Sequence, residues 1–313
     1  MSVEITEKQH YVWRRYLSSW QDDLEDYRLW TGLLKQNQVK KLGLKDVAQS
    51  RYFYKLEELT DEELLFLKRY KRELSNNVQY IAELIITGYE WYSKIKRDIS
   101  SGKIEINKDG EHELKKVEAN VFELLLSHIE HMGDELLKCN SSKGLINLAA
   151  QQEKEILFYM MVQYMRTKVR KDSFTGALSE RADLQSIGVK CWPFFIIITA
   201  MQWVEAMIFK HDYRFVVVHN NSEVPFITGD QPAVNARWKE TDSEGNITSL
   251  EIYYPMSPKT ALVLDFTPGD KFSDVYEDKT YVIERNKMIM DEAELFIFSN
   301  EENLLKGMMG VID

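Results

Sequence analysis

The chain has 313 residues, which is enough for one large domain or two closely packed ones. A hydrophobic content of 44% and an aromatic content of 12% supply the apolar surface for a core, so the composition excludes a disordered protein. The formal net charge of -10 argues against nonspecific, phosphate-driven binding of nucleic acid, although a local basic groove is compatible with it.

Two segments bear on localisation. The N-terminal "MSVEITEKQ" is charged and polar, which argues against a signal peptide. Residues 191–209 approach the length of a membrane-spanning helix, but Gln202 and Glu205 would then lie in hydrocarbon at a high free-energy cost. Two cysteines are too few for a disulfide scaffold and favour reduced thiols. We therefore expect a cytoplasmic protein with a buried core helix and no membrane association.

The first two-thirds of the chain is predicted to be mainly helical. Residues 1–56 mix a helical start with short strands or a loop packed on the body. A capping box of Thr60 and Glu63 then begins a series of helices. The expected helices cover 61–74, 77–98, 111–138, 143–170 and 190–210.

After Lys210 the pattern changes to short runs rich in β-branched and aromatic residues, which is typical of antiparallel strands. Helices followed by strands, without βαβ alternation, indicate an α+β protein and exclude a doubly wound nucleotide-binding fold. We expect a mainly helical region over 1–210 packed on an antiparallel β-sheet region with a terminal helix over 211–313, in one integrated unit.

Polar side chains follow one face of the expected helix over 143–170 at spacings of three or four residues. The row comprises Gln152, Glu155, Tyr159, Gln163, Arg166 and Arg170. Because the other faces are apolar, the helix should be largely buried. The row then faces solvent, a polar cleft or internal partners, and the sequence leaves these alternatives open.

Two short patterns have residue types that suit catalysis or metal binding. His128, His131 and Glu135 have the spacing of ligands on one helical face, but a surface histidine pair is the favoured interpretation. In "VPFITGDQPAVN", a turn holds Asp230 at a strand end, which suits a catalytic acid, a metal ligand or a turn that caps its own backbone. Glycine-rich phosphate loops and the GxSxG nucleophile motif are absent from the sequence.

Four separated segments share features with one bacterial family. They are "HYVWRRYL", "IEHMGDELLK", "FYMMVQYMRTKVR" and "FITGDQPAVN", the last followed by "YPMSP". In this order they resemble the family catalogued as domain of unknown function 4238. Trp13 stands where that family usually has proline, and Gln231 stands where it has asparagine. The likeness extends from about residue 8 to 300.

The resemblance selects polar positions and implies a bacterial, cytoplasmic protein. We hypothesise that these positions meet in one cleft, with His10, Glu130 and Asp230 catalytic and Tyr11, Gln163 and Arg166 binding substrate. The histidine and two carboxylates could bind a divalent metal or act as acid and base, while Arg166 and Gln163 could hold a phosphate-bearing substrate. If the first segment is helical, Arg14 lies one turn from His10, yet the resemblance does not single out Arg14 or Arg15.

Two functions are compatible with these residues. The first is a phosphodiester hydrolase acting on a nucleic acid or nucleotide, a nuclease-like effector in a toxin or phage-defence setting, with a protein partner from a defence system. It predicts that the polar residues line one pocket. The alternative is a non-catalytic interaction or ligand-sensing protein, in which the same residues form a buried, mutually paired hydrogen-bond network.

Overall fold

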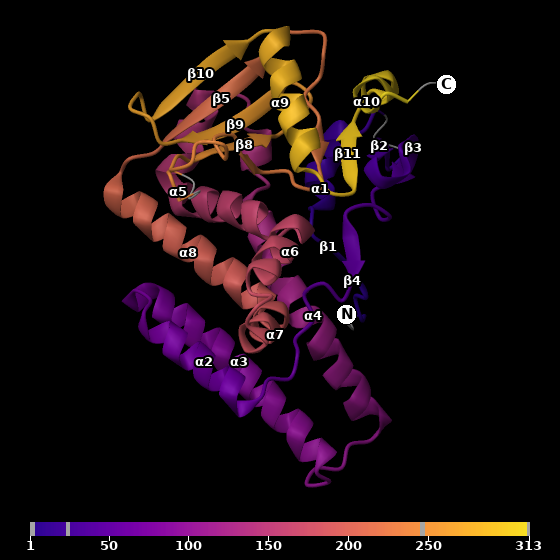
Figure 1. Cartoon of the computed structure of the whole chain (residues 1–313), viewed down its shortest axis with the longest axis vertical. Helices are drawn as coiled ribbons and strands as arrows, with labels where there is room; N and C mark the ends of the chain where they lie inside the picture. Colours follow the sequence, from indigo (N-terminus) through magenta and orange to yellow (C-terminus); the bar gives the residue numbers. More distant parts are fainter. Residues whose placement is uncertain (1–3, 23–25, 245–247, 312–313) are drawn as a thin grey trace. The chain divides into compact units, whose positions relative to one another are not determined.

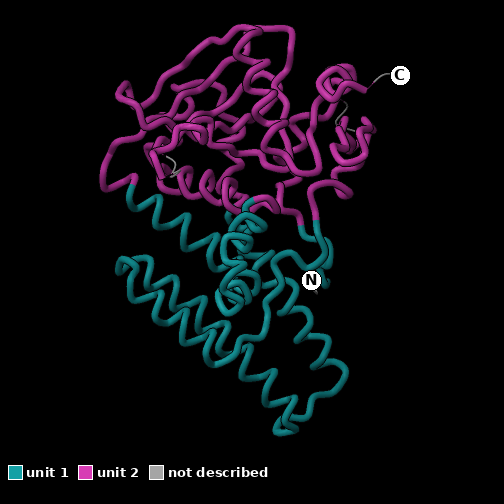
Figure 2. Tube along the Cα trace, viewed as in Figure 1, with its two compact units in different colours: residues 1–9, 50–129, 170–206 teal, residues 10–49, 130–169, 207–313 magenta. Residues whose placement is uncertain are grey.

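The computed structural model describes residues 4–22, 26–244 and 248–311. The chain forms two compact units, and each unit is assembled from three separate segments (Figure 2). A helical unit comprises residues 1–9, 50–129 and 170–206, and a β-rich unit comprises residues 10–49, 130–169 and 207–313. The chain thus passes repeatedly between the units, which differs from the single boundary near residue 210 expected from the sequence.

Six helices build the helical unit, although parts of three of them belong to the β-rich unit (Figure 1). They are α2 (Asp61–Arg72), α3 (Asn76–Ser100), α4 (Lys108–Met132), α6 (Lys168–Ala177), α7 (Ala182–Lys190) and α8 (Trp192–Lys210). The capping box that begins α2 is confirmed: the Thr60 hydroxyl accepts from the Glu63 amide at 3.2 Å, and the Glu63 carboxylate accepts from the Thr60 amide at 2.9 Å. Glu63 also forms an ion pair with Lys190 of α7 at 2.8 Å.

Among the described residues, α8 is the helix long and apolar enough to cross a membrane by composition. Its polar side chains have partners inside the helical unit. Glu205 accepts a hydrogen bond from Asn77 at 3.0 Å and another from Ser75, and Gln202 accepts one from Tyr70 at 3.5 Å. Satisfied polar groups on a mostly buried helix fit the core helix predicted from the sequence.

The larger sheet of the β-rich unit has the strand order β10-β5-β9-β8-β7 (Figure 1). The strands are β5 (Arg214–Asn220), β7 (Val234–Asn235), β8 (Glu251–Pro255), β9 (Thr260–Asp265) and β10 (Phe272–Glu277). Neighbours run antiparallel except for β10, which pairs in parallel with β5. The α+β class is confirmed, but the expectation of a purely antiparallel sheet is wrong.

A second sheet combines both ends of the sequence in the order β3-β2-β11-β6. Its strands are β2 (Arg28–Leu33), β3 (Gln38–Gly43), β6 (Thr228–Gly229) and β11 (Phe296–Ser299). Strand β2 pairs antiparallel with β3 and with β11. The short strands considered for the first 56 residues are therefore present, and the mainly helical layout expected for the N-terminal two-thirds is not confirmed there. Two further short strands, β1 (Lys8–His10) and β4 (Gln49–Arg51), pair with each other.

Helices cover the larger sheet of the β-rich unit. The helices of this unit are α1 (Arg14–Leu17), α5 (Ser142–Met165), α9 (Lys279–Glu292) and α10 (Glu302–Met309), with single 3-10 turns η1 (Ser18–Trp20), η2 (Leu34–Gln36) and η3 (Leu136–Lys138). Val216 and Val218, alternate residues of β5, join one apolar cluster with Val282 and Ile289 of α9. Helix α5 packs against β5 and β10. Burial of each such aliphatic side chain contributes roughly 1.5–3 kcal/mol.

Candidate site: a buried polar framework beside a basic pocket

The C-terminal end of α5 joins two of the predicted motifs. Arg166, which is 1% exposed, donates from Nη1 to Glu130 Oε1 at 2.5 Å and from Nη2 to the carbonyl of His10 at 2.6 Å. Burial raises the pKa of Glu130, while the positive charge of Arg166 acts in the opposite direction. His10 thus contributes its main chain to this cluster, and Glu130 serves as the counter-ion of a buried guanidinium.

The next two residues, Thr167 and Lys168, connect the end of α5 to the last of the four segments and to Glu294. The Thr167 hydroxyl donates to Gln231 Oε1, and Gln231 Nε2 donates to the carbonyl of Ala233 at 2.6 Å. Lys168 forms an ion pair with Glu294 at 2.9 Å. Three consecutive residues, from Arg166 to Lys168, therefore hold segments that are distant in the sequence.

Asp230 is enclosed by backbone amides. Its Oδ1 accepts from the amide of Glu294 at 2.9 Å, and its Oδ2 accepts from the amides of Leu295 at 2.8 Å and Phe296 at 3.3 Å. Burial raises the pKa of Asp230 to about 6, although these amides act to lower it. The sequence allowed Asp230 to be a catalytic acid, a metal ligand or a cap of the backbone. Its hydrogen bonds match the backbone cap, because the carboxylate fixes the segment that enters β11.

The remaining predicted substrate-binding residues are buried. Tyr11 and Gln163 are each 1% exposed, as is Arg166. Gln163 Nε2 has no hydrogen-bond partner among the described residues. Because a ligand in solvent does not reach such side chains in this conformation, the predicted group of binding residues belongs to the interior of the β-rich unit.

Tyrosine hydroxyls extend the polar framework. Tyr16 donates to the carbonyl of Pro255 at 2.7 Å, and its hydroxyl lies 2.7 Å from that of Thr228. Tyr159 of α5 and Tyr254 of β8 share a hydrogen bond of 2.8 Å. The rings of Tyr16 and Tyr254 stack with centroids 4.9 Å apart. The first and last motifs are therefore linked, since Tyr16 and Thr228 belong to them.

No group of three or more His, Cys, Asp or Glu side chains with the arrangement of a metal site occurs among the described residues. The set of His10, Glu130 and Asp230, considered for a divalent metal, is not gathered: Glu130 binds Arg166 and Asp230 binds amides. The motifs meet through hydrogen bonds between neighbouring segments, and the convergence of their polar side chains in one cleft stays a prediction.

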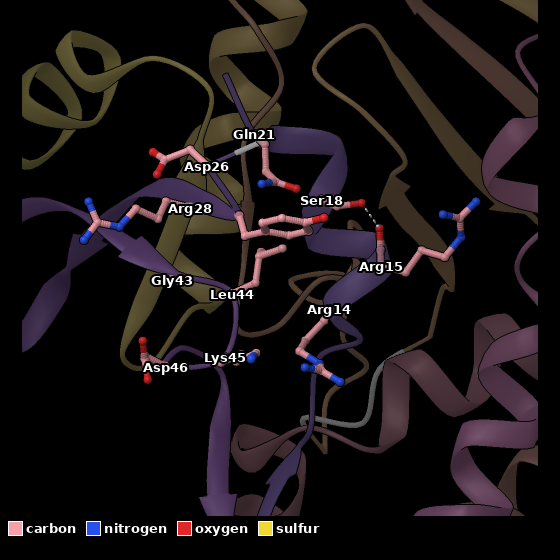
Figure 3. Close-up of a pocket in the computed structure, with 11 residues that line it drawn as sticks. Arg14, Arg15, Ser18, Gln21, Asp26, Arg28, Gly43, Leu44, Lys45 and Asp46 are labelled. Atoms are coloured by element: carbon pink, nitrogen blue, oxygen red, sulfur yellow. Dashed lines mark hydrogen bonds between the residues drawn. The ribbon is translucent and has the colours of Figure 1, made fainter. Parts of the chain in front are cut away.

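A pocket of about 620 Å³ opens in the β-rich unit, formed by α1, η1, the start of β2 and the turn between β3 and β4 (Figure 3). It is lined by Arg14, Arg15, Ser18, Gln21, Asp26, Tyr27, Arg28, Gly43, Leu44, Lys45 and Asp46. The labelled arginines of Figure 3 come from two different elements, α1 and β2, and border the same hollow. Its volume is within the range of sites for small molecules.

The pocket has a surplus of positive charge. Arg15 forms an ion pair with Asp134, and Asp26 is neutralised by Lys41 at 3.0 Å. By contrast, three cations of the lining have no ion-pair partner among the described residues: Arg14, Arg28 and Lys45. Such a cluster in a protein with a net charge of -10 creates a local positive potential that attracts anions.

The ring of His10 lies close to this pocket. Burial lowers the pKa of His10 to about 4, and the charge of Arg14 lowers it further, while the backbone of Leu44 and Lys45 acts in the opposite direction. His10 Nε2 is buried and has no hydrogen-bond partner among the described residues. At neutral pH the ring is therefore uncharged and offers a nitrogen that the fold does not use.

Comparison with known proteins identifies the family. The family described as "Protein of unknown function (DUF4238)" matches residues 8–191 and 193–303. The chain belongs to the DUF4238 family. No curated protein and no solved structure matches it. Trp13, at the position where DUF4238 proteins usually carry proline, has a φ of -64°, which is the value that proline would fix.

The DUF4238 motifs do not contain most of the pocket. Arg28 and Lys45 lie outside all four motifs, and Arg14 occupies an unselected position within the first one. The adjacent arginines of "HYVWRRYL" were the one available signal, because paired cations beside aromatic residues are unusual in an acidic chain. The rest depends on tertiary structure, which brings the residues around β2 and β3 to α1.

Proposed function

We propose that this DUF4238 protein binds a small phosphate-bearing anion in the basic pocket and acts as a ligand-sensing protein. The observation that carries the proposal is the group of three cations, Arg14, Arg28 and Lys45, without ion-pair partners among the described residues. Guanidinium and ammonium groups are the side chains that bind phosphate best, through charge-assisted hydrogen bonds. The polar framework then has a supporting role, since Arg166 holds the chain at His10, four residues before Arg14.

The contacts of the carboxylates favour binding over metal-assisted hydrolysis. Glu130 is committed to Arg166, and both oxygens of Asp230 accept from amides. The predicted hydrolase would need at least one of these groups to face substrate. The burial of Glu130, Arg166 and Asp230 and the pairing of Glu130 with Arg166 support a non-catalytic role for these residues.

Calorimetric titration with pyrophosphate tests the proposal. Wild type should bind, and Arg28→Ala and Lys45→Ala should each weaken binding about 10- to 100-fold, because a hydrogen bond to a charged group contributes roughly 1.5–3 kcal/mol. Lys40→Ala is the matched control, since Lys40 is an exposed lysine of β3 outside the pocket. No binding by the folded wild type, or an equal loss in Lys40→Ala, would contradict the proposal.

His10 favours a second candidate function, phosphodiester hydrolysis. Its uncharged ring could accept the proton of a water that attacks phosphorus while the P–O bond to the leaving group breaks, once a change of conformation exposes the buried Nε2 to the pocket. Arg14 would stabilise the charge that develops on the phosphate. Hydrolysis of bis(p-nitrophenyl) phosphate by wild type, lost in a folded His10→Ala variant, is the expected result. The effector or phage-defence setting and its partners stay predictions from the sequence.

A further inference from the structure

Tyr27 is displayed at the pocket in a conformation that costs free energy. Its φ is +49°, in the left-handed region that non-glycine residues rarely adopt. The side chain is 71% exposed although it belongs to the pocket lining. The Tyr27 carbonyl accepts from the amide of Leu44 at 3.1 Å, so the main chain of one lining residue is bonded to that of another. The fold therefore fixes the main chain of Tyr27 and leaves most of its aromatic ring exposed.

Different residues of the pocket lining suit different chemical groups of a single class of ligand. Arg14, Arg28 and Lys45 suit phosphate oxygens. Asp46 has no ion-pair partner among the described residues, and its Oδ2 lies over Gly43, where a Cβ would come within 2.9 Å of it. A carboxylate in such a place accepts hydrogen bonds from ribose hydroxyls. An exposed ring beside cations is the platform on which nucleobases stack.

We infer that the ligand of the basic pocket is a free nucleotide, with its base stacked on Tyr27 and its phosphates on the three cations. This inference rests on the proposed anion-binding function and specifies its ligand. Inorganic polyphosphates have no group for an exposed aromatic ring to bind. A pocket of about 620 Å³ suits one small molecule, and the net charge of -10 opposes a long nucleic acid backbone.

A pair of ligands with the same phosphate chain isolates the contribution of the nucleoside, which is the base together with the ribose. Adenosine triphosphate and inorganic tripolyphosphate are titrated into the full chain by calorimetry. Wild type should bind the nucleotide at least tenfold more tightly than tripolyphosphate, because base stacking on an aromatic side chain typically changes affinity by about 5- to 150-fold. Tyr27→Ala should remove most of this difference without changing the affinity for tripolyphosphate, and Tyr27→Trp should keep it.

Tyr80→Ala is the control, since Tyr80 is a similarly exposed tyrosine, at 67%, on α3. Circular dichroism confirms that each variant is folded. Equal affinity of wild type for the two ligands would overturn the nucleotide assignment and leave the anion site intact. Absence of binding to both would overturn the anion site as well. A single-stranded oligonucleotide that binds far more tightly than the nucleotide, again through Tyr27, would overturn the assignment to a free nucleotide.

Discussion

The buried ion pair between Glu130 and Arg166 should contribute far more to stability than the surface pair between Glu135 and Lys138. The N···O distances are nearly equal, at 2.5 Å and 2.6 Å, but the side chains of the buried pair are 11% and 2% exposed and those of the surface pair 58% and 57%. Glu130→Ala leaves a buried guanidinium without its counter-ion, which costs about 3–5 kcal/mol. Glu135→Ala should cost below about 1 kcal/mol.

Urea unfolding, followed by circular dichroism and tryptophan fluorescence, measures both losses. With a slope of about 2–3 kcal/mol per molar urea, Glu130→Ala should lower the midpoint by about 1–2 M, and Glu135→Ala by less than about 0.5 M. Because apolar replacement of a whole buried pair is often tolerated, Glu130→Leu combined with Arg166→Met should recover much of the loss. Equal midpoint shifts for the two single variants, with unchanged slopes, would refute the assignment of Arg166 and Glu130 as a mutually dependent buried pair.

Two further predictions concern Asp230 and Gly133. Burial raises the pKa of Asp230 to about 6 in the folded state, whereas its pKa in the unfolded state is near 3.8. The folded state therefore binds the proton more tightly, and protonation of Asp230 stabilises the fold. This stabilisation is complete below about pH 4 and is lost as pH rises through 6. The free energy of unfolding of wild type minus that of Asp230→Asn should therefore fall by about 2–2.5 kcal/mol between pH 4 and 7, and a rise would mean that the three amides dominate the pKa. A Cβ at Gly133 would overlap the buried ring of Tyr159, so Gly133→Ala should lower the free energy of unfolding by about 1–3 kcal/mol. The control is Gly176→Ala, which should have no such effect because a Cβ at Gly176 meets nothing within 4 Å.

Local signals predicted much of the secondary structure. The capping box at Thr60, the helices through α2, α3 and α8, and the strand-rich end all follow from patterns within about 20 residues. Pairing between distant segments was beyond these signals. Strand β2 joins β11 across more than 260 residues, and the parallel neighbours β5 and β10 carry no mark that distinguishes them from antiparallel ones.

The candidate site was predictable only in part, because main-chain atoms form many of its contacts. The sequence selected His10, Arg166 and Asp230, and all three belong to a connected polar framework. Residue types suggested side chains acting on a ligand. The structure instead pairs Arg166 with a carbonyl and Asp230 with amides, and every residue except proline has both groups. The pocket escaped prediction because tertiary structure, which no periodicity encodes, brings Arg28 at the start of β2 and Lys45 in the turn after β3 to the same hollow.

At position 10 the main chain and the side chain have separate roles, because Arg166 binds the carbonyl of His10 and not its imidazole. Any amino acid at position 10 would present the same carbonyl oxygen, so the cluster around Arg166 places no demand on the imidazole. Its Nε2 is desolvated by burial and has no hydrogen-bond partner among the described residues, so this atom does not stabilise the fold. The cluster around Arg166 thus does not require a histidine, and an exchange at position 10 would instead remove the hydrogen bonds between the imidazole and the backbone of Leu44 and Lys45.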